Sequence, residues 1–150
     1  MRFGALALSA CSSSTNAPAS WFTDEAAARA RANLEHKALV IDFTETWSVP
    51  SVNLSNLLDT PETWSKLTAD FIPLRIDVSN QDESSDAWRA RYGRPNLPAV
   101  LFVDRNGAVL ARIDSTPDET ALRLMIATAA SKRGISAIRS RVTSRCAARP

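Results

Sequence analysis

The spacing of apolar residues along the chain predicts its strands. Every second residue from Ile72 to Val78 is apolar, which is the period of an extended strand with one buried face. Three shorter runs are almost continuously apolar, as strands buried on both faces are. The predicted strands cover residues 38–44, 71–78, 99–103 and 108–113. The last two are joined by Asp104-Arg105-Asn106-Gly107, in which Asn-Gly accommodates positive φ angles, so we expect a hairpin.

Apolar residues three and four positions apart predict helices around these strands. The first helix is rich in alanine and runs from Asp24 to about His36, with Thr23 as its cap. We expect one of its faces to carry Ala27, Ala30 and Leu34. The last helix opens at the capping box Thr116-Pro117-Asp118-Glu119. We expect it to direct inward Leu122, Met125, Ile126 and Ala129.

Three further helices complete the pattern. One follows Trp47, the second begins at Pro61, and the third covers residues 84–92. The resulting order is α-β-α-α-β-α-β-β-α, which predicts an α/β fold with a central mixed sheet flanked by helices. We expect the early βα units to be parallel and the late hairpin to supply an antiparallel edge.

Composition narrows the class of protein. The 150 residues are 45% hydrophobic and 23% charged, which suits one compact domain with its own core. No apolar run approaches the roughly 18–20 residues of a membrane-spanning helix, so an integral membrane protein is excluded. Two cysteines and one histidine exclude a disulfide framework, a zinc finger and a haem site, and we expect neither metal nor cofactor.

Charge divides the chain into an acidic body and a basic end. The formal charge is +2, but residues 21–130 hold 11 basic and 16 acidic side chains. Residues 131–150 hold six basic side chains and no acidic one. An acidic body argues against nucleic acid as its partner.

The first twenty residues have the order of an export signal. Met1-Arg2 precedes an apolar stretch over residues 3–10, and Leu8-Ser9-Ala10-Cys11 resembles a bacterial lipobox, whose cysteine is lipidated. Residues 11–20 then form a small, polar tether. We expect a protein anchored through Cys11 on the periplasmic side of the bacterial envelope, or secreted if the lipobox is not used. The alternative is a frayed N-terminus with an incidental cysteine.

A longer set of motifs resembles a known family. Ile41-Asp42-Phe43-Thr44-Glu45-Thr46-Trp47-Ser48-Val49-Pro50-Ser51 combines a strand end, a tryptophan and a proline-containing helix start. Asp59-Thr60-Pro61-Glu62 and Leu97-Pro98-Ala99 follow it in order. Residues 21–130 thereby resemble the thioredoxin superfamily, and more narrowly the periplasmic thioredoxin-like domain of transmembrane thiol–disulfide reductases. The resemblance implies a thioredoxin-like fold with an N-terminal helix.

The chain departs from this family where the chemistry would occur. Active members carry W-C-x-x-C, and here Ser48 and Ser51 take the cysteine positions around Val49 and Pro50. In the family, a helix N-terminus lowers the pKa of the first thiol from about 8.5 to roughly 7, and the second thiol resolves the mixed disulfide. A serine hydroxyl forms no disulfide, so we expect no thiol–disulfide exchange through this motif.

A serine nucleophile would need a base beside it, and the sequence offers none. The only histidine, His36, ends the first helix, and nothing pairs Lys37 with either serine. We therefore expect Ser48 to be a helix N-cap and Ser51 a tolerated residue of the first turn, not hydrolase nucleophiles.

Two further positions match the family. Asp42 matches a buried carboxylate that relays a proton to the second cysteine. Without a thiol to serve, we expect it to accept hydrogen bonds from nearby hydroxyls such as that of Ser51. Pro98 matches the family's cis-proline, which exposes the backbone of the preceding residue, here Leu97, to an extended substrate chain. In one interpretation Trp47, Leu97 and Pro98 form a peptide-binding groove. In the alternative, Pro98 only defines a turn of the fold and Trp47 only packs against it.

Two alternatives remain open for residues 131–150. Ile135, Ile138 and Val142 recur at helical spacing among arginines, which is typical of a segment lying on an anionic membrane. Serines and Gly134 favour a solvated, disordered end instead, and we prefer that interpretation. Cys146 is the thiol expected to stay free in the mature chain.

The main hypothesis is a redox-inactive envelope protein that binds or scaffolds extended or unfolded polypeptides. In a first rival hypothesis, Cys146 supplies the thiol of a thioredoxin-family oxidoreductase or redox-homeostasis protein. In a second, the serines at positions 48 and 51 replace native cysteines.

Overall fold

The computed structural model describes residues 19–147 of the chain, with side chains to residue 134. The predicted export signal, Cys11 and most of the tether lie outside the described residues, as do residues 148–150 of the basic end. Within the described range, helices and strands follow one another in the predicted order.

The strands form one mixed sheet in the order β2-β1-β3-β4. These strands are β1 (Ala38–Thr44), β2 (Phe71–Asp77), β3 (Ala99–Val103) and β4 (Val109–Ile113). β1 pairs in parallel with β2 and antiparallel with β3, and β3 and β4 form the predicted hairpin. The mixed sheet is confirmed, although β3 is an inner strand and only β4 lies at the antiparallel edge. Residues that follow β1 therefore emerge from the middle of the sheet.

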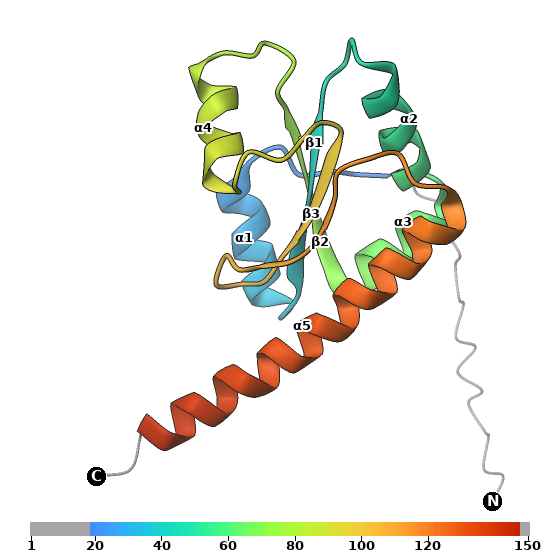
Figure 1. Ribbon diagram of the computed structural model, residues 1–150. Helices are drawn as coiled ribbons and strands as arrows, with labels where there is room; N and C mark the ends of the chain where they lie inside the picture. Colours follow the sequence, from blue (N-terminus) through green and yellow to red (C-terminus); the bar gives the residue numbers. More distant parts are fainter. Residues whose placement is uncertain (1–18, 148–150) are drawn as a thin grey trace, which may run out of the picture.

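Helices cover both faces of the sheet (Figure 1). One face carries α1 (Glu25–Leu34) and α4 (Glu83–Arg91), and the other carries α2 (Val49–Leu58), α3 (Pro61–Asp70) and α5 (Glu119–Ala147). Apolar side chains of β1 alternate between two cores, with Leu39 and Ile41 on the α1 side and Val40 on the α5 side. Every residue of β1 is buried, so both cores depend on this strand.

The first helix buries a different face from the expected one. Asp24, not Thr23, is its N-cap, and the Asp24 carboxylate accepts a hydrogen bond from the Ala27 N–H at 2.7 Å. The buried residues are Ala28 and Ala32, whereas Leu34 is 74% exposed. Alanines occupy every side of this helix, so apolar spacing could not distinguish its faces and the predicted face of Ala27, Ala30 and Leu34 was wrong.

The last helix is longer than expected. Asp118 caps it in place of Thr116, accepting a hydrogen bond from the Ala121 N–H at 2.7 Å. Leu122, Ile126 and Ala129 are buried as predicted, but Met125 lies beside that stripe and is 36% exposed. The helix continues to Ala147, so the preferred interpretation of residues 131–147 as a disordered end was wrong.

Candidate functional site

The motif residues lie where β1 ends, at the carboxyl edge of its parallel pair with β2. Trp47 occupies the loop between β1 and α2 and is 61% exposed. Its indole N–H donates to the Ser79 carbonyl at 3.1 Å, and the Thr46 N–H donates to the Ser79 hydroxyl at 2.8 Å. These bonds fasten the loop to the segment after β2, so the exposed indole has a defined position.

The two motif serines lie at the helix positions expected for them, but their hydroxyls do not make the expected hydrogen bonds. Ser48 takes the N-cap position of α2, but its side chain makes no capping hydrogen bond. Ser51 is buried in the first turn, and its hydroxyl has no hydrogen-bond partner within the described part of the chain. The expectation that a nearby hydroxyl bonds to Asp42 is confirmed, but that hydroxyl belongs to Ser55 and not to Ser51. A thiol, which is a weak donor and packs as a small apolar group, would suit this position better than a hydroxyl does.

Asp42 is buried at the middle of the site and has other partners. Its Oδ2 accepts hydrogen bonds from the Ser55 hydroxyl at 3.0 Å and from Arg75 Nε at 2.8 Å. Burial raises the pKa of the Asp42 carboxyl, and the charge and hydrogen bond of Arg75 with the bond from Ser55 offset only part of that rise. Asp42 thus forms an ion pair in which one partner is removed from solvent.

Arg75 is the functional-region residue that sequence reasoning missed. Its two Nη atoms donate to the two carboxylate oxygens of Asp59, each at 3.2 Å, while its Nε donates to Asp42. Its guanidinium also lies 4.3 Å from the ring centroid of Trp21, whose indole N–H donates to Asp59 at 2.6 Å. The available signal was a charged residue inside an apolar strand, with Leu74 and Ile76 on either side of it. Arg75 joins β1, β2, the end of α2 and the segment before α1.

The proline turn lies at the same edge of the sheet. The Leu97–Pro98 peptide bond is cis, as the resemblance implies. Ala99, which follows it, is the register partner of Phe43, so Pro98 lies beside the end of β1 that leads to Trp47. Pro98 is buried and Leu97 packs partly against the α1-side core.

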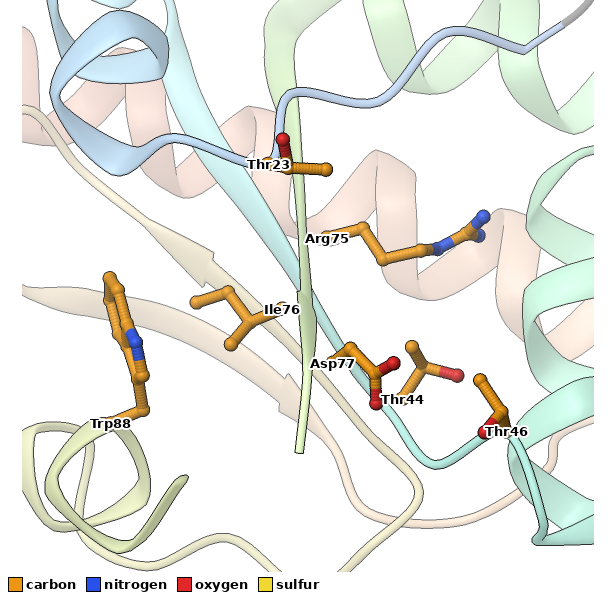
Figure 2. A pocket seen from close by; sticks show the side chains of 7 residues that line it. All are labelled: Thr23, Thr44, Thr46, Arg75, Ile76, Asp77 and Trp88. Carbon is orange, nitrogen blue, oxygen red and sulfur yellow. The ribbon is translucent and has the colours of Figure 1, made fainter. Parts of the chain in front are cut away.

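A cleft of about 440 Å³ opens beside the motif, at the ends of β1 and β2 (Figure 2). Three threonines, Arg75, Asp77 and the ring of Trp88 contribute to its walls; the lining residues are Thr23, Thr44, Thr46, Arg75, Ile76, Asp77 and Trp88. The sequence did not predict this cleft, because it depends on where the segment before α1 leaves the edge of β2. Its polar walls combine hydroxyls with groups of both charges, and they pair no nucleophile with a histidine.

Comparison with known proteins identifies the family. A family model described as thioredoxin-like matches residues 20–105. This chain belongs to the thioredoxin-like family. No curated protein matches its sequence.

Solved structures agree with the thioredoxin-like fold. The oxidised C-terminal domain of Neisseria meningitidis DsbD is 20% identical, covering 70% of this chain and 95% of that one, with a TM-score of 0.60. A thioredoxin from Thermus thermophilus is 18% identical, covering 78% and 91%, with a TM-score of 0.66. A disulphide isomerase from Xylella fastidiosa is 19% identical, covering 72% and 95%, with a TM-score of 0.59. At these identities the likeness concerns the fold.

The only histidine of this thioredoxin-like chain lies far from its motif serines. His36 precedes β1, whereas Ser48 follows it, so a seven-residue strand of about 20 Å separates them. His36 Nδ1 lies 3.3 Å from Arg105 Nη1 instead. The described residues contain no group of three or more histidine, cysteine or acidic side chains placed to hold a metal. None of their helices combines the length and apolarity needed to cross a membrane.

Proposed function

We propose that this protein is a thioredoxin-fold binding module without dithiol chemistry, which holds extended polypeptides at the motif edge of its sheet. The observation that carries the proposal is that hydroxyls occupy both motif positions, Ser48 and Ser51. A hydroxyl cannot form the mixed disulfide through which thiol–disulfide exchange proceeds. No histidine lies near either serine to make it a hydrolytic nucleophile.

The surface around the motif supports binding. Trp47 is 61% exposed, and Val49 and Val52 of α2 are 69% and 39% exposed. Apolar side chains gathered at a surface mark interaction sites when they lie close together, and indoles are frequent anchors of interfaces. The cis Leu97–Pro98 bond adds support, because in the family the backbone before the cis-proline pairs with an added extended chain.

Binding is tested with a fluorescently labelled unfolded peptide. We expect Trp47→Ala to weaken binding by about 2 kcal/mol, or roughly 30-fold, because truncation removes a central aromatic anchor. Pro98→Thr should also weaken it. Leu124→Ala, which removes another exposed apolar side chain on α5, serves as the control and should bind like the parent chain. Unchanged affinity in both groove variants would contradict the proposed site.

Redox inactivity is tested by reduction of insulin with dithiothreitol, which we expect the protein not to accelerate. The rival in which Cys146 supplies a thiol predicts activity that disappears in Cys146→Ser. Cys146 lies thirteen residues beyond Arg133 in α5, about 20 Å along the helix axis, and Arg133 already contacts the end of the sheet opposite the motif. This arrangement favours the binding module over an intramolecular reaction at the motif.

We also propose that the protein is attached to the bacterial envelope through a lipid on Cys11, on the periplasmic side. The support is the order of charge, apolar stretch and lipobox in the first eleven residues. An intact mass of protein extracted from membranes should show cleavage before Cys11 and an added acyl group. A mass equal to that of the unprocessed chain from Met1 would contradict this attachment.

A further inference from the structure

Helix α5 has two parts with different surroundings. Up to Arg133 it is bound to the body: Leu122, Ile126 and Ala129 are buried, and Lys132 Nζ donates to the Leu110 carbonyl at 3.1 Å. Arg133 forms an ion pair with Asp70 and donates to the His36 carbonyl at 3.2 Å. From Gly134 to Ala147 the helix continues past the sheet and away from the body (Figure 1).

A helix of this length needs a surface to lie on. The thirteen residues after Gly134 extend about 20 Å. The bound part of α5 nucleates them, but in water the further propagation of a helix is close to neutral for residues other than the best helix formers. Gly134 lowers helix propensity further at the point where the helix leaves the body. We therefore expect a partner beyond the described residues to stabilise the helical conformation of the projecting part.

The sequence of α5 gives this part an apolar stripe. At 100° per residue, Ile135, Ile138 and Val142 fall on the same stripe as Leu124, opposite the stripe of Leu122, Ile126 and Ala129 that is buried against the body. Leu124 is 68% exposed, so this stripe faces away from the body where side chains are described. Arg139 takes a position on one side of the stripe, and Arg141 and Arg145 take positions on the other.

Charge selects the kind of partner. No acidic residue follows Glu119 in the chain, while Lys132, Arg133 and the three arginines of the projecting part are all basic. The body adds Lys37 and Arg105 at the end where α5 leaves it. The acidic groups there have partners within the body: Glu35 pairs with Lys37, Asp70 pairs with Arg133, and the buried Asp104 accepts hydrogen bonds from the backbone of its own turn. The partner surface must therefore be anionic.

We propose that the projecting part of α5 binds the surface of an anionic phospholipid membrane, with its apolar stripe at the acyl boundary and its arginines among the headgroups. A narrow apolar stripe with basic residues on both sides and serines opposite is the pattern of a helix lying in a membrane interface. Pairing of two copies through the stripe is disfavoured, because every charged residue beside it is basic. This inference does not depend on peptide binding at the motif.

Binding is measured with the full chain carrying Cys11→Ser, so that no acyl chain contributes, and with a fluorophore on Cys146 that brightens in an apolar environment. Vesicles of phosphatidylcholine alone are compared with vesicles containing one quarter phosphatidylglycerol. We expect fluorescence and cosedimentation to increase only with the anionic vesicles. The triple variant Arg139→Gln, Arg141→Gln, Arg145→Gln should lower the affinity on the order of 100-fold, since each basic residue near an anionic surface contributes about a factor of five.

A matched control removes three charges elsewhere. This control is the triple variant in and after α4, Arg89→Gln, Arg91→Gln, Arg94→Gln, and it should bind nearly as the parent chain does. A separate double variant tests the apolar stripe: we expect Ile135→Ser with Ile138→Ser to abolish the fluorescence change. Equal binding to neutral and anionic vesicles, or equal loss in the α4 control, would overturn the proposal. A dimer in the absence of lipid that Ile138→Ser dissociates would also overturn it, because the stripe would then join two copies.

Discussion

Two serines one turn apart in α2 have opposite surroundings. The Ser51 hydroxyl is buried without a hydrogen-bond partner among the described residues, whereas the Ser55 hydroxyl donates to Asp42 Oδ2 at 3.0 Å. An unpaired buried polar group costs about 1–3 kcal/mol, and a hydrogen bond to a charged group contributes about 1.5–3 kcal/mol. The same atom type is therefore destabilising at one position and stabilising at the other.

We predict that Ser51→Ala raises the free energy of unfolding by about 1 kcal/mol, because it removes the unpaired hydroxyl at little loss of volume. Ser55→Ala, the matched control in the same helix, should lower it by a similar amount. Both substitutions gain the helix propensity of alanine, so the difference between them reports the hydrogen bonding. Urea unfolding measures both values. A loss of stability in Ser51→Ala would mean that its hydroxyl has a partner.

Asp42 should give the protein a pH-dependent stability of defined sign. Its pKa in the folded protein is raised, chiefly by burial, so the folded state binds its proton more tightly than the unfolded state does. The contribution of Asp42 is then largest below its usual pKa of 3.8 and decreases as the pH rises through the raised value. We predict that the stability of Asp42→Asn relative to the parent chain increases between pH 4 and 7.

A second carboxylate supplies the control for this measurement. Hydrogen bonds from Ser85 lower the pKa of Asp82, the N-cap of α4, so its contribution is present above its usual pKa and is lost as the pH falls. Asp82→Asn should therefore lose stability relative to the parent chain as the pH rises from 2 to 5. Denaturant unfolding at several pH values should give difference curves of opposite slope for the two variants. Parallel slopes would contradict the raised pKa of Asp42.

At the scale of elements, the N-terminus of α2 has the setting that a reactive thiol needs. Ser48 precedes the first N–H groups of the helix, Asp42 lies buried nearby in β1, and the cis Leu97–Pro98 turn adjoins the same end of the sheet. A helix N-terminus lowers the pKa of a thiol placed there, which supplies thiolate at neutral pH.

We predict that the double variant Ser48→Cys, Ser51→Cys gains measurable insulin reductase activity, while the parent chain has none. Ser48→Cys alone is the control: it should form mixed disulfides without turnover, because no second thiol resolves them. The assay uses the Cys11→Ser, Cys146→Ser background, so that only the motif contributes thiols. An inactive double variant that still folds would show that the surroundings of the motif no longer support the exchange.

The order of elements was predictable, but their exact ends and contacts were not. Strands were located by apolar residues at every second position or in continuous runs, because a strand buries one face or both. Helices were located by apolar residues three and four positions apart, because a helix buries one face. Thr23 and Asp24 can both cap a helix, so spacing alone could not choose between them. The position of β3 inside the sheet and the ion pair between Asp42 and Arg75 depend on how strands distant in sequence align, which no local pattern encodes. The unpaired hydroxyl of Ser51 likewise follows from three-dimensional packing.

At the scale of the whole molecule, the two ends of the sheet differ in chemistry. The end that follows β1 carries Trp47, the motif serines and the cleft, whereas the end that precedes β1 carries His36, Lys37 and the point where α5 leaves the body. About 20 Å of strand separates them. A membrane bound through α5 would therefore leave the motif edge directed toward the aqueous side.

The segment before α1 is fastened to the edge of β2, and this attachment has a mechanical consequence. Phe22 donates to the Pro73 carbonyl and accepts from the Arg75 N–H, at 2.9 and 2.8 Å, while Trp21 stacks on the Arg75 guanidinium. Tension entering from an upstream tether would load these bonds in shear, along the direction of β2, before it could unwind α1. Force would pass into the sheet through its edge strand and, through the bond from Trp21 to Asp59, into the C-terminal end of α2. The N-terminal end of α2 and the loop of Trp47 lie outside this path, so the exposed indole would keep its position under strain on the anchor.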